Sequence, residues 1–438
     1  MLEIYEFGII GMGPAGIGMA MSLRNTSVIK STICFERGNN ISGINCPALT
    51  KNEYCCLGTC SIISGIGGAS TLSSGKISDF PAGSGLVDFF DSEWQLRELL
   101  SKVISLLTNK IALKKIEIDA EIKKRAKAFY KQRNIDYKYY DVYEFDGNKY
   151  RNFVQETVQE LRNEGLQLFD NTEVINIIRE PDTLHFCIKV KTPDGERLFF
   201  VRNLVLATGA LDIQERLIDN LLKPTTNYFE LGVRVEACSS AFGNTLSTHG
   251  DLKLKFGRGR TYCVTANGRI IAYQTGGVHF LEGSMDYSAS IDYTNLAVLI
   301  KCDDRTFGDF ITQYREKYNG LPIKQKLVDY LNGQISNESV KSTLTSAICG
   351  DINTLFPMDI NNAIKEFISS VLVGGMNIPE DAITLVAPEA KILRNLQIAE
   401  NFELDNNIFV IGAATGKFRG ILQSLCSGIR CGQLLIRG

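Results

Sequence analysis

Near its beginning the sequence reads EIYEFGIIGMGPAG over residues 3–16. The apolar run at 7–10 predicts a buried strand, and the small and apolar residues after position 13 predict a helix. Three glycines stand between them in the spacing GxGxxG: Gly11, Gly13 and Gly16. A second apolar segment, residues 31–35, predicts another strand and ends at Glu36. The order strand, glycine-rich turn, helix, strand and acid predicts the opening unit of a parallel α/β sheet.

Each part of this unit has a physical role in binding a dinucleotide. We expect Gly11 to make the tight turn, Gly13 to let the backbone approach a pyrophosphate, and Gly16 to let the helix pack close to the strand. The helix N-terminus, at Pro14 and Ala15, offers free N–H groups and a positive dipole to the phosphates. Glu36 is placed to accept hydrogen bonds from adenosine ribose hydroxyls. A plain glycine-rich turn explains fewer of these features.

Composition limits the partners that we expect. The 438 residues suffice for two or three domains, and the formal net charge of −2 favours neither nucleic acid nor a membrane surface. The N-terminus has no basic region typical of a signal peptide, and no apolar run is long enough to cross a bilayer. Twelve scattered cysteines without such a signal indicate free thiols. We therefore expect a cytoplasmic protein.

The middle of the chain alternates between helical and strand patterns. Residues 38–85 are rich in glycine and cysteine and predict backbone lying against a ligand, or else a long surface loop. Helical spacing predicts helices at 92–107, with Ser92 as N-cap, and at 114–130 and 150–163. Strands are predicted at 173–178, 184–190 and 197–201, with a hairpin turn at 193–195, and again from 203 into Ala207-Thr208-Gly209.

The sequence pattern changes near residue 227. Glycine-punctuated segments predict strands at 231–236, 252–256, 261–265 and 269–273, and amphipathic helical regions follow at 307–331 and 361–371. The chain then gives a strand at 408–411, the sequence GAATGKFRG and a final helix with Leu425, Ile429 and Leu434 inward.

Three of these separated stretches resemble the glutathione-reductase-type FAD-binding fold. They are the GxGxxG unit with Glu36, the strand ending in Ala207-Thr208-Gly209, and the C-terminal strand–glycine–helix unit. The chain is further similar to the uncharacterised "FAD-dependent dehydrogenase" family of bacteria and archaea. Members carry a cysteine-dotted loop with Gly-Gly-Ala (Gly67-Gly68-Ala69 here), Gly-Val-Arg-Val-Glu (232–236 here), a strand near Thr-Phe-Cys (Thr261-Tyr262-Cys263 here) and a late Pro-Glu (388–389 here).

The sequence departs from that family at two positions. Ala413 stands where the family has the aspartate that binds the ribitol chain, and Ser74 stands where it has aspartate in Ser-Asp-Gly-Lys. Loss of the first carboxylate removes a charge-assisted hydrogen bond. The resemblance therefore implies weaker FAD binding or altered chemistry at the flavin end.

The fold class that we expect is α/β: a Rossmann-like FAD-binding domain of glutathione-reductase type, discontinuous in sequence. It comprises residues 1–90, 141–215 and 380–438. A helical insertion covers 91–140, and a sheet-rich α+β substrate domain covers 216–379. The cofactor-binding residues that follow from motif and resemblance are Gly11, Gly13, Pro14, Ala15, Gly16, Glu36, Arg37, Gly67, Gly68, Ala69, Ser73, Val174, Ala207, Thr208, Gly209, Gly412, Ala413, Gly420 and Ile421.

Three residues are candidates for catalysis: Lys76, Cys263 and His279. Lys76 lies beside the flavin or contacts the pyrophosphate. Cys263 lines the substrate cavity or is a plain thiol, and His279 donates a proton or is structural. Lys417 and Arg419 add charge near the flavin or face solvent. Cys46, Cys55, Cys56 and Cys60 lack the CxxC spacing of a zinc site, so we predict no metal.

The sequence thus predicts an FAD-dependent oxidoreductase that transfers hydride between flavin N5 and a small organic substrate. No second GxGxxG is present, so the electrons would come from transiently bound NADH or NADPH, from a protein redox partner or from the substrate. Two alternatives stay open. One is a flavin- or nucleotide-binding redox sensor or complex subunit without turnover, and the other is a flavin-dependent monooxygenase.

Overall fold

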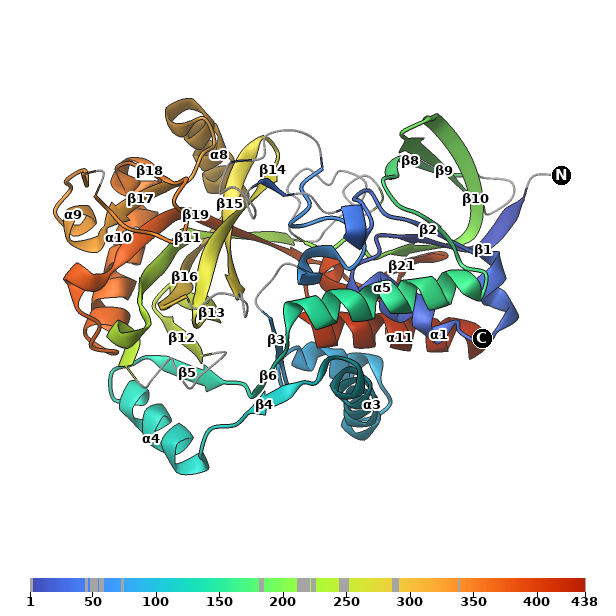
Figure 1. Cartoon of the computed structure of the whole chain (residues 1–438), viewed down its shortest axis with the longest axis horizontal. Helices are drawn as coiled ribbons and strands as arrows, with labels where there is room; N and C mark the ends of the chain where they lie inside the picture. The colour runs from blue at the N-terminus through green and yellow to red at the C-terminus, as the bar shows by residue number, and fades with distance from the viewer. Residues whose placement is uncertain are drawn as a thin grey trace.

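The structure is a computed structural model that describes residues 3–43, 46–47, 54, 59–71, 75–180, 185–210, 221, 226–243, 252–285, 291–337 and 339–437. Two sheets dominate it (Figure 1). The first is largely parallel and the second is largely antiparallel, so the fold is mixed α/β, as predicted.

The first sheet holds the predicted glycine-rich unit at its centre. Its strands run in the order β20-β21-β10-β1-β2-β7, and the contacts from β21 through β7 are parallel. Their bounds are β20 Glu403–Asp405, β21 Ile408–Val410, β10 Gly195–Leu206, β1 Ile4–Ile10, β2 Thr32–Phe35 and β7 Gln167–Phe169. Because β1 is covered on both faces, its second half, residues 7–10, is a continuous buried run rather than an alternating one.

Helices cover one face of this sheet (Figure 1). They are α1 Pro14–Ser22, α5 Gly147–Asn163 and α11 Ile421–Arg437. Glycines let α1 and α11 cross closely, since a Cβ at Gly428 would lie 2.0 Å from the Ala15 carbonyl oxygen. The predicted inward face of α5, including Phe153, Val154 and Leu161, is buried, which confirms that prediction.

An antiparallel meander covers the other face. It is formed by β8 Glu173–Arg179, β9 Phe186–Thr192 and the first half of β10. The predicted hairpin turn joins β9 to β10. The prediction of two separate strands at 197–201 and from 203 is wrong, because β10 is one strand that pairs with β9 and then with β1.

The second sheet has the order β18-β17-β19-β11-β16-β13-β12-β5. Its strands are β18 Ile348–Cys349, β17 Ile323–Lys326, β19 Thr384–Asn395, β11 Thr226–Cys238, β16 Tyr293–Cys302, β13 Gly259–Thr265, β12 Leu252–Phe256 and β5 Asp136–Tyr139. The hairpin of β14 Gly268–Thr275 and β15 Val278–Met285 packs beside it. Helices α8 Asp304–Tyr318, α9 Leu327–Leu331 and α10 Met358–Phe367 complete this half, and π-helical turns follow at Ile368–Val373.

Two predicted helical regions contain strands. The segment 91–140 holds α3 Glu93–Ile111 and α4 Ala120–Lys131, but also β4 Lys114–Ile116 and β5. Here α4 begins late because Asp119 caps it, accepting from the N–H groups of Glu121 and Ile122. The predicted Ser92 cap of α3 is confirmed. In the same way β17 interrupts the predicted helix at 307–331.

The predicted domain boundaries remain a prediction, and they do not follow the division of the strands between the two sheets. β5 and β19 both pair within the second sheet. The prediction places β5 in the helical insertion, 91–140, and β19 in the FAD-binding domain, 380–438. The strands β3 Lys76–Ser78, β6 Val142–Glu144 and β4 form a small separate sheet. In the part of the chain that the structure describes, no helix combines the length and apolar character needed to cross a membrane.

Candidate functional site

The first half of the molecule is built on the first sheet and the second half on the second sheet. A cavity of about 660 Å³ is lined by residues of both halves. Its lining comes from the carboxyl ends of β1, β2 and β10, and from β13, β14, β15 and β19 of the second half. This volume lies within the range of about 300 to 1,000 Å³ typical of ligand and cofactor sites. Ligands of open parallel sheets bind outside the carboxyl ends of the strands, so the position is the expected one.

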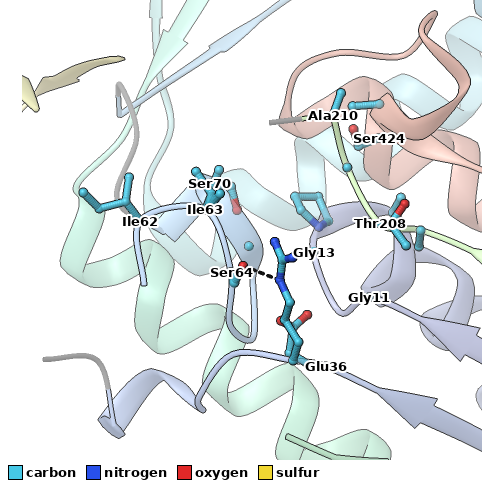
Figure 2. Close-up of a pocket in the computed structure, with 18 of the residues that line it drawn as sticks. Gly11, Gly13, Glu36, Ile62, Ile63, Ser64, Ser70, Thr208, Ala210 and Ser424 are labelled. Atoms are coloured by element: carbon cyan, nitrogen blue, oxygen red, sulfur yellow. Dashed lines mark hydrogen bonds between the residues drawn. The ribbon is translucent and has the colours of Figure 1, made fainter. Parts of the chain in front are cut away.

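The glycine-rich turn forms one end of the cavity (Figure 2). Gly11 has φ +96°, and a Cβ there would lie 2.6 Å from the Ala207 carbonyl oxygen. A Cβ on Gly16 would lie 2.1 Å from the Gly11 oxygen, so Gly16 packs the helix onto the turn. At Gly13 the nearest atom to such a Cβ is 4.0 Å away. Gly13 therefore faces open space in the cavity.

The start of α1 is electrostatically suited to an anion. Gly13 is its N-cap and Pro14 its first residue, no side chain caps it, and its first turn holds no acidic residue. Uncapped N–H groups and the helix dipole give this end a positive potential. The turn therefore presents the features that a pyrophosphate requires.

Glu36 lies at the base of this end (Figure 2) and is buried. Its Oε1 accepts from the N–H groups of Gly38 and Gly65, at 2.9 and 2.8 Å, and its Oε2 accepts from Met12 N–H at 2.9 Å. A carboxylate has about four acceptor positions. Three are used by backbone, so Glu36 can accept about one further hydrogen bond from a ligand hydroxyl.

Residues after β2 form the wall opposite the turn. Ser64 and Ser70 stand across from Gly13 in Figure 2, and the Arg37 Nε donates to Ser64 Oγ at 2.9 Å. Gly68 and Ala69 belong to the same wall.

The middle of the cavity is lined by the end of β10 and the beginning of α11. Ala207, Thr208 and Gly209 lie here, and the Thr208 hydroxyl is buried without a hydrogen-bond partner among the described residues. Ala413, Gly420, Ile421 and Ser424 face them from the C-terminal unit. An unsatisfied buried hydroxyl is rare in native structures, so a ligand atom is the natural partner of Thr208.

The second half contributes a chamber of charged and aromatic residues. Glu282 lines it and its Oε2 lies 2.7 Å from Lys391 Nζ, while its Oε1 lies 3.5 Å from Arg234 Nη2. Behind them Arg234 forms a bidentate pair with Glu389, at 2.6 and 3.2 Å. These four side chains form a buried network of ion pairs.

Burial and charge act in opposite directions on the pKa values of this network. Burial alone would raise the pKa of Glu282, but Lys391 and Arg234 outweigh it and lower the pKa. Burial alone would lower the pKa of Lys391, but Glu282, Tyr273 and Glu389 together outweigh it and hold the pKa well above its usual range. Both groups are therefore charged at neutral pH.

Cys263 and Lys76 also line the chamber. Cys263 has φ +44° and lies where the pairing of β13 with β16 changes register, so a β-bulge holds it at the wall. Burial raises the pKa of its thiol. Lys76 Nζ donates to the Val264 carbonyl oxygen, next to Cys263.

The structure brings most of the predicted site residues together. The predicted residues that line the cavity are Gly11, Gly13, Pro14, Ala15, Glu36, Arg37, Gly68, Ala69, Lys76, Val174, Ala207, Thr208, Gly209, Cys263, Ala413, Gly420 and Ile421. Gly16, Gly67 and Gly412 are not in the lining and pack against neighbouring chain. Ser73 and Ser74 lie outside the described residues, as do Cys55 and Cys56.

His279 is not part of the lining. Its Nδ1 lies 3.0 Å from the Gly320 carbonyl oxygen, and its ring centroid lies 5.1 Å from that of Tyr54. Its buried position beside α8 corresponds to the structural alternative, and we do not carry the catalytic prediction for His279 further.

Sequence reasoning missed Tyr262, Tyr273, Glu282 and Lys391 in the lining. Tyr273, Glu282 and Lys391 stand in strands without a motif, and in the Thr261-Tyr262-Cys263 stretch the prediction names only Cys263. The only available signal was a charged residue inside a strand pattern, at Glu282 and Lys391. Arg419 lines the cavity, whereas Lys417 is exposed.

The described cysteines are free thiols, and Cys46 and Cys60 are buried. Within the described ranges, no three His, Cys, Asp or Glu side chains cluster in a way that could hold a metal ion.

No protein-family model and no curated protein matches the chain. Solved structures do match. Glycine oxidase from Geobacillus kaustophilus is 15% identical, with 99% of this chain and 95% of that chain covered and a TM-score of 0.41. A geranylgeranyl bacteriochlorophyll reductase-like protein from Thermoplasma acidophilum is 11% identical, with coverage of 99% and 78% and a TM-score of 0.39. A flavoprotein/dehydrogenase from Cytophaga hutchinsonii is also 11% identical, with coverage of 99% and 78% and a TM-score of 0.38. Likenesses at this level carry no argument about activity.

Proposed function

We propose that the cavity binds FAD and that the chain is an oxidoreductase acting on a small organic substrate. The observation that carries this proposal is the continuity of one cavity. It runs from the glycine-rich turn and Glu36 to a chamber lined by Lys76, Glu282 and Lys391. A dinucleotide held at the first end would extend toward the second.

Two local features support the fit of FAD. Gly13 leaves open space where a side chain would block the backbone from a pyrophosphate. Thr208, in the cavity lining, presents a buried hydroxyl without a partner among the described residues. In this proposal Glu36 accepts from an adenosine ribose hydroxyl, the Gly11–Gly13 turn holds the pyrophosphate, and Thr208 bonds the flavin half.

When bound, FAD supplies hydride transfer at flavin N5. The residues of the chain position the substrate and exclude water. The network of Glu282 and Lys391 fixes two charges at the chamber wall, and neither group titrates near neutral pH. Burial raises the pKa of the Cys263 thiol, so the thiol stays protonated. It can donate a hydrogen bond but does not act as a nucleophile.

The test is the visible absorption spectrum of the purified protein, with the cofactor released by denaturation and identified. Stoichiometric FAD is the expected result. Anaerobic reduction by NADH and by NADPH then identifies the electron source, with a protein redox partner as the remaining donor if neither reduces the flavin. A colourless protein that also fails to take up added FAD would contradict the proposal.

A second candidate, an FAD-binding protein without turnover, is favoured by Ala413. This residue lines the flavin half, where the related family has a carboxylate. We expect Ala413→Asp to tighten FAD binding about tenfold, because one charge-assisted hydrogen bond contributes about 1.5 to 3 kcal/mol. If the variant gains turnover that the wild-type protein lacks, the wild-type protein is a binding protein. Turnover by the wild-type protein would show that it is an enzyme.

A further inference from the structure

Arg419 is a cation at the cavity wall that forms no direct ion pair with a carboxylate among the described residues. It stands just before Gly420 and α11, and it lines the cavity. Its Nη2 donates to the Ile392 carbonyl oxygen on β19 at 2.6 Å. Its Nε is buried and has no hydrogen-bond partner among the described residues.

The carboxylates of the chamber network are already paired with other cations. Glu282 is bound by Lys391 and Arg234, and Glu389 by Arg234. The four members of that network hold equal numbers of positive and negative charges. They leave no negative charge for Arg419.

The neighbouring pair of Glu230 on β11 and Arg260 on β13 is balanced in the same way. Glu230 accepts two hydrogen bonds from Arg260, at 2.7 and 2.5 Å. Glu230 attracts Arg419, and Arg419 is hydrogen-bonded to the Tyr262 side chain, but Glu230 is already paired with Arg260.

An arginine cannot discharge itself in this position, because its guanidinium remains protonated in proteins. Burial lowers the pKa of Arg419 from its ordinary value, which is the effect of desolvating a cation without a full counter-charge. A guanidinium fork matches the two oxygens of a carboxylate. The described residues therefore supply no carboxylate of its own to Arg419, and the position suits an anion from a ligand.

Two observations place that anion on the substrate side of the cavity. Arg419 donates to the Ile392 carbonyl oxygen on β19 and is hydrogen-bonded to Tyr262 on β13, so it faces the second sheet. The adjoining lining is largely apolar or aromatic: Ile62, Ile63, Tyr262, Ile271 and Tyr273. Such walls suit the hydrocarbon or aromatic body of an acid.

We propose that Arg419 binds the carboxylate of a small organic acid, which is the substrate class of this site. The inference deepens the proposed function and rests on it. Arg419 anchors the acid, and the apolar walls hold its body.

The first test needs no substitution. FAD-loaded protein is titrated calorimetrically with probes of matched shape: benzoate against benzamide, and hexanoate against hexanamide. We expect at least one carboxylate to bind about 30-fold or more tightly than its amide, as for a buried charge pair. Equal affinities within both pairs, or no binding of either carboxylate, overturns the proposal.

The second test uses Arg419→Gln and Arg419→Lys, with Lys417→Gln as control. The control removes the same charge from the same loop, at an exposed residue outside the lining. We expect Arg419→Gln to abolish the preference for carboxylate, Arg419→Lys to retain part of it, and Lys417→Gln to retain all of it. A preference that survives Arg419→Gln overturns the proposal.

The flavin spectrum separates the remaining outcomes. If Arg419→Gln folds but no longer retains FAD, Arg419 belongs to the cofactor site and the proposal is overturned. If Arg419→Gln does not fold, the carboxylate preference of Arg419→Lys and the wild-type comparison of carboxylates with amides test the proposal instead. Wild-type protein that binds no FAD contradicts the proposed function itself, whereas FAD-loaded protein without carboxylate preference contradicts only this inference.

Discussion

At the scale of single residues, the glycines of the first turn differ in what a methyl group would meet. Gly11 and Gly16 are surrounded by backbone, but Gly13 is not. Gly13 also has φ −70° and ψ −174°, which alanine adopts without strain. The chain therefore tolerates a side chain at Gly13, and only a ligand would exclude it.

We accordingly expect Gly13→Ala to leave the unfolding free energy within about 1 kcal/mol of wild type and to weaken FAD binding at least about tenfold, because the methyl keeps the pyrophosphate from the backbone. Urea unfolding and FAD titration measure the two effects. Gly16→Ala is the matched comparison and should destabilise the fold itself. Unchanged FAD affinity in Gly13→Ala would show that no pyrophosphate lies at this turn.

The thiol of Cys263 gives a second prediction. Because burial raises its pKa and the thiolate is the reactive form, we expect Cys263 to remain unmodified by iodoacetamide at pH 7.5 while exposed Cys238 reacts. Peptide mass spectrometry over time measures both. Labelling of Cys263 as fast as that of Cys238 would indicate an activated thiol and restore a nucleophilic role.

At the scale of elements, the crossing of α1 and α11 fixes the distance between the two cofactor-side motifs. Gly18 and Gly428 lie at the contact, and Cβ atoms there would come within 2.3 and 2.0 Å of carbonyl oxygens on the other helix. The two helices are far apart in sequence, so the sequence alone does not indicate that their glycines lie in contact.

We expect Gly428→Ala to lower the unfolding free energy by about 2 to 3 kcal/mol, since the helices must separate to admit the methyl group. FAD affinity should fall as well, because α1 carries the turn. Gly308→Ala in α8 is the control: nothing lies within 4 Å of its Cβ position, so it should be neutral or slightly stabilising. Equal effects of the two variants would contradict the close crossing.

At the scale of the whole molecule, the buried ion network joins strands β11, β15 and β19 across the second half. Glu282 has its pKa lowered from 4.5, so as pH falls the unfolded chain takes up this proton first. The stability contributed by this carboxylate is complete above about pH 4.5 and is lost as pH falls through its lower folded pKa. Lys391, with a raised pKa, loses its contribution only in strong alkali.

We therefore expect Glu282→Gln to lower stability at pH 7 by about 3 kcal/mol, because Lys391 loses its closest carboxylate. The difference from wild type should shrink as pH falls below about 4.5. Urea midpoints measured between pH 3 and 8 provide the test, with exposed Glu316→Gln as control. A difference that stays constant through the acid range would contradict an ionised pair at this position.

The sequence by itself determined the nucleotide end of the site. The turn, its helix and Glu36 lie within 36 residues, and each role follows from local spacing: a glycine where φ is positive, a helix start, an acid after the next strand. Local geometry of this kind depends on neighbours in the chain, so the positions of Gly11, Gly13 and Glu36 in the cavity lining could be predicted.

Only the tertiary structure decided the other end. Glu282, Lys391 and Arg419 come from three distant segments, and they meet because β19 pairs with β11 and packs against β15. Strand patterns predict which face of a strand is buried, but not which strand will be its neighbour. The same limit explains why the pairing of β19 with β11 and the position of His279 outside the cavity lining could not be predicted. The charge balance that leaves Arg419 without a carboxylate partner among the described residues is a property of that pairing, not of any local motif.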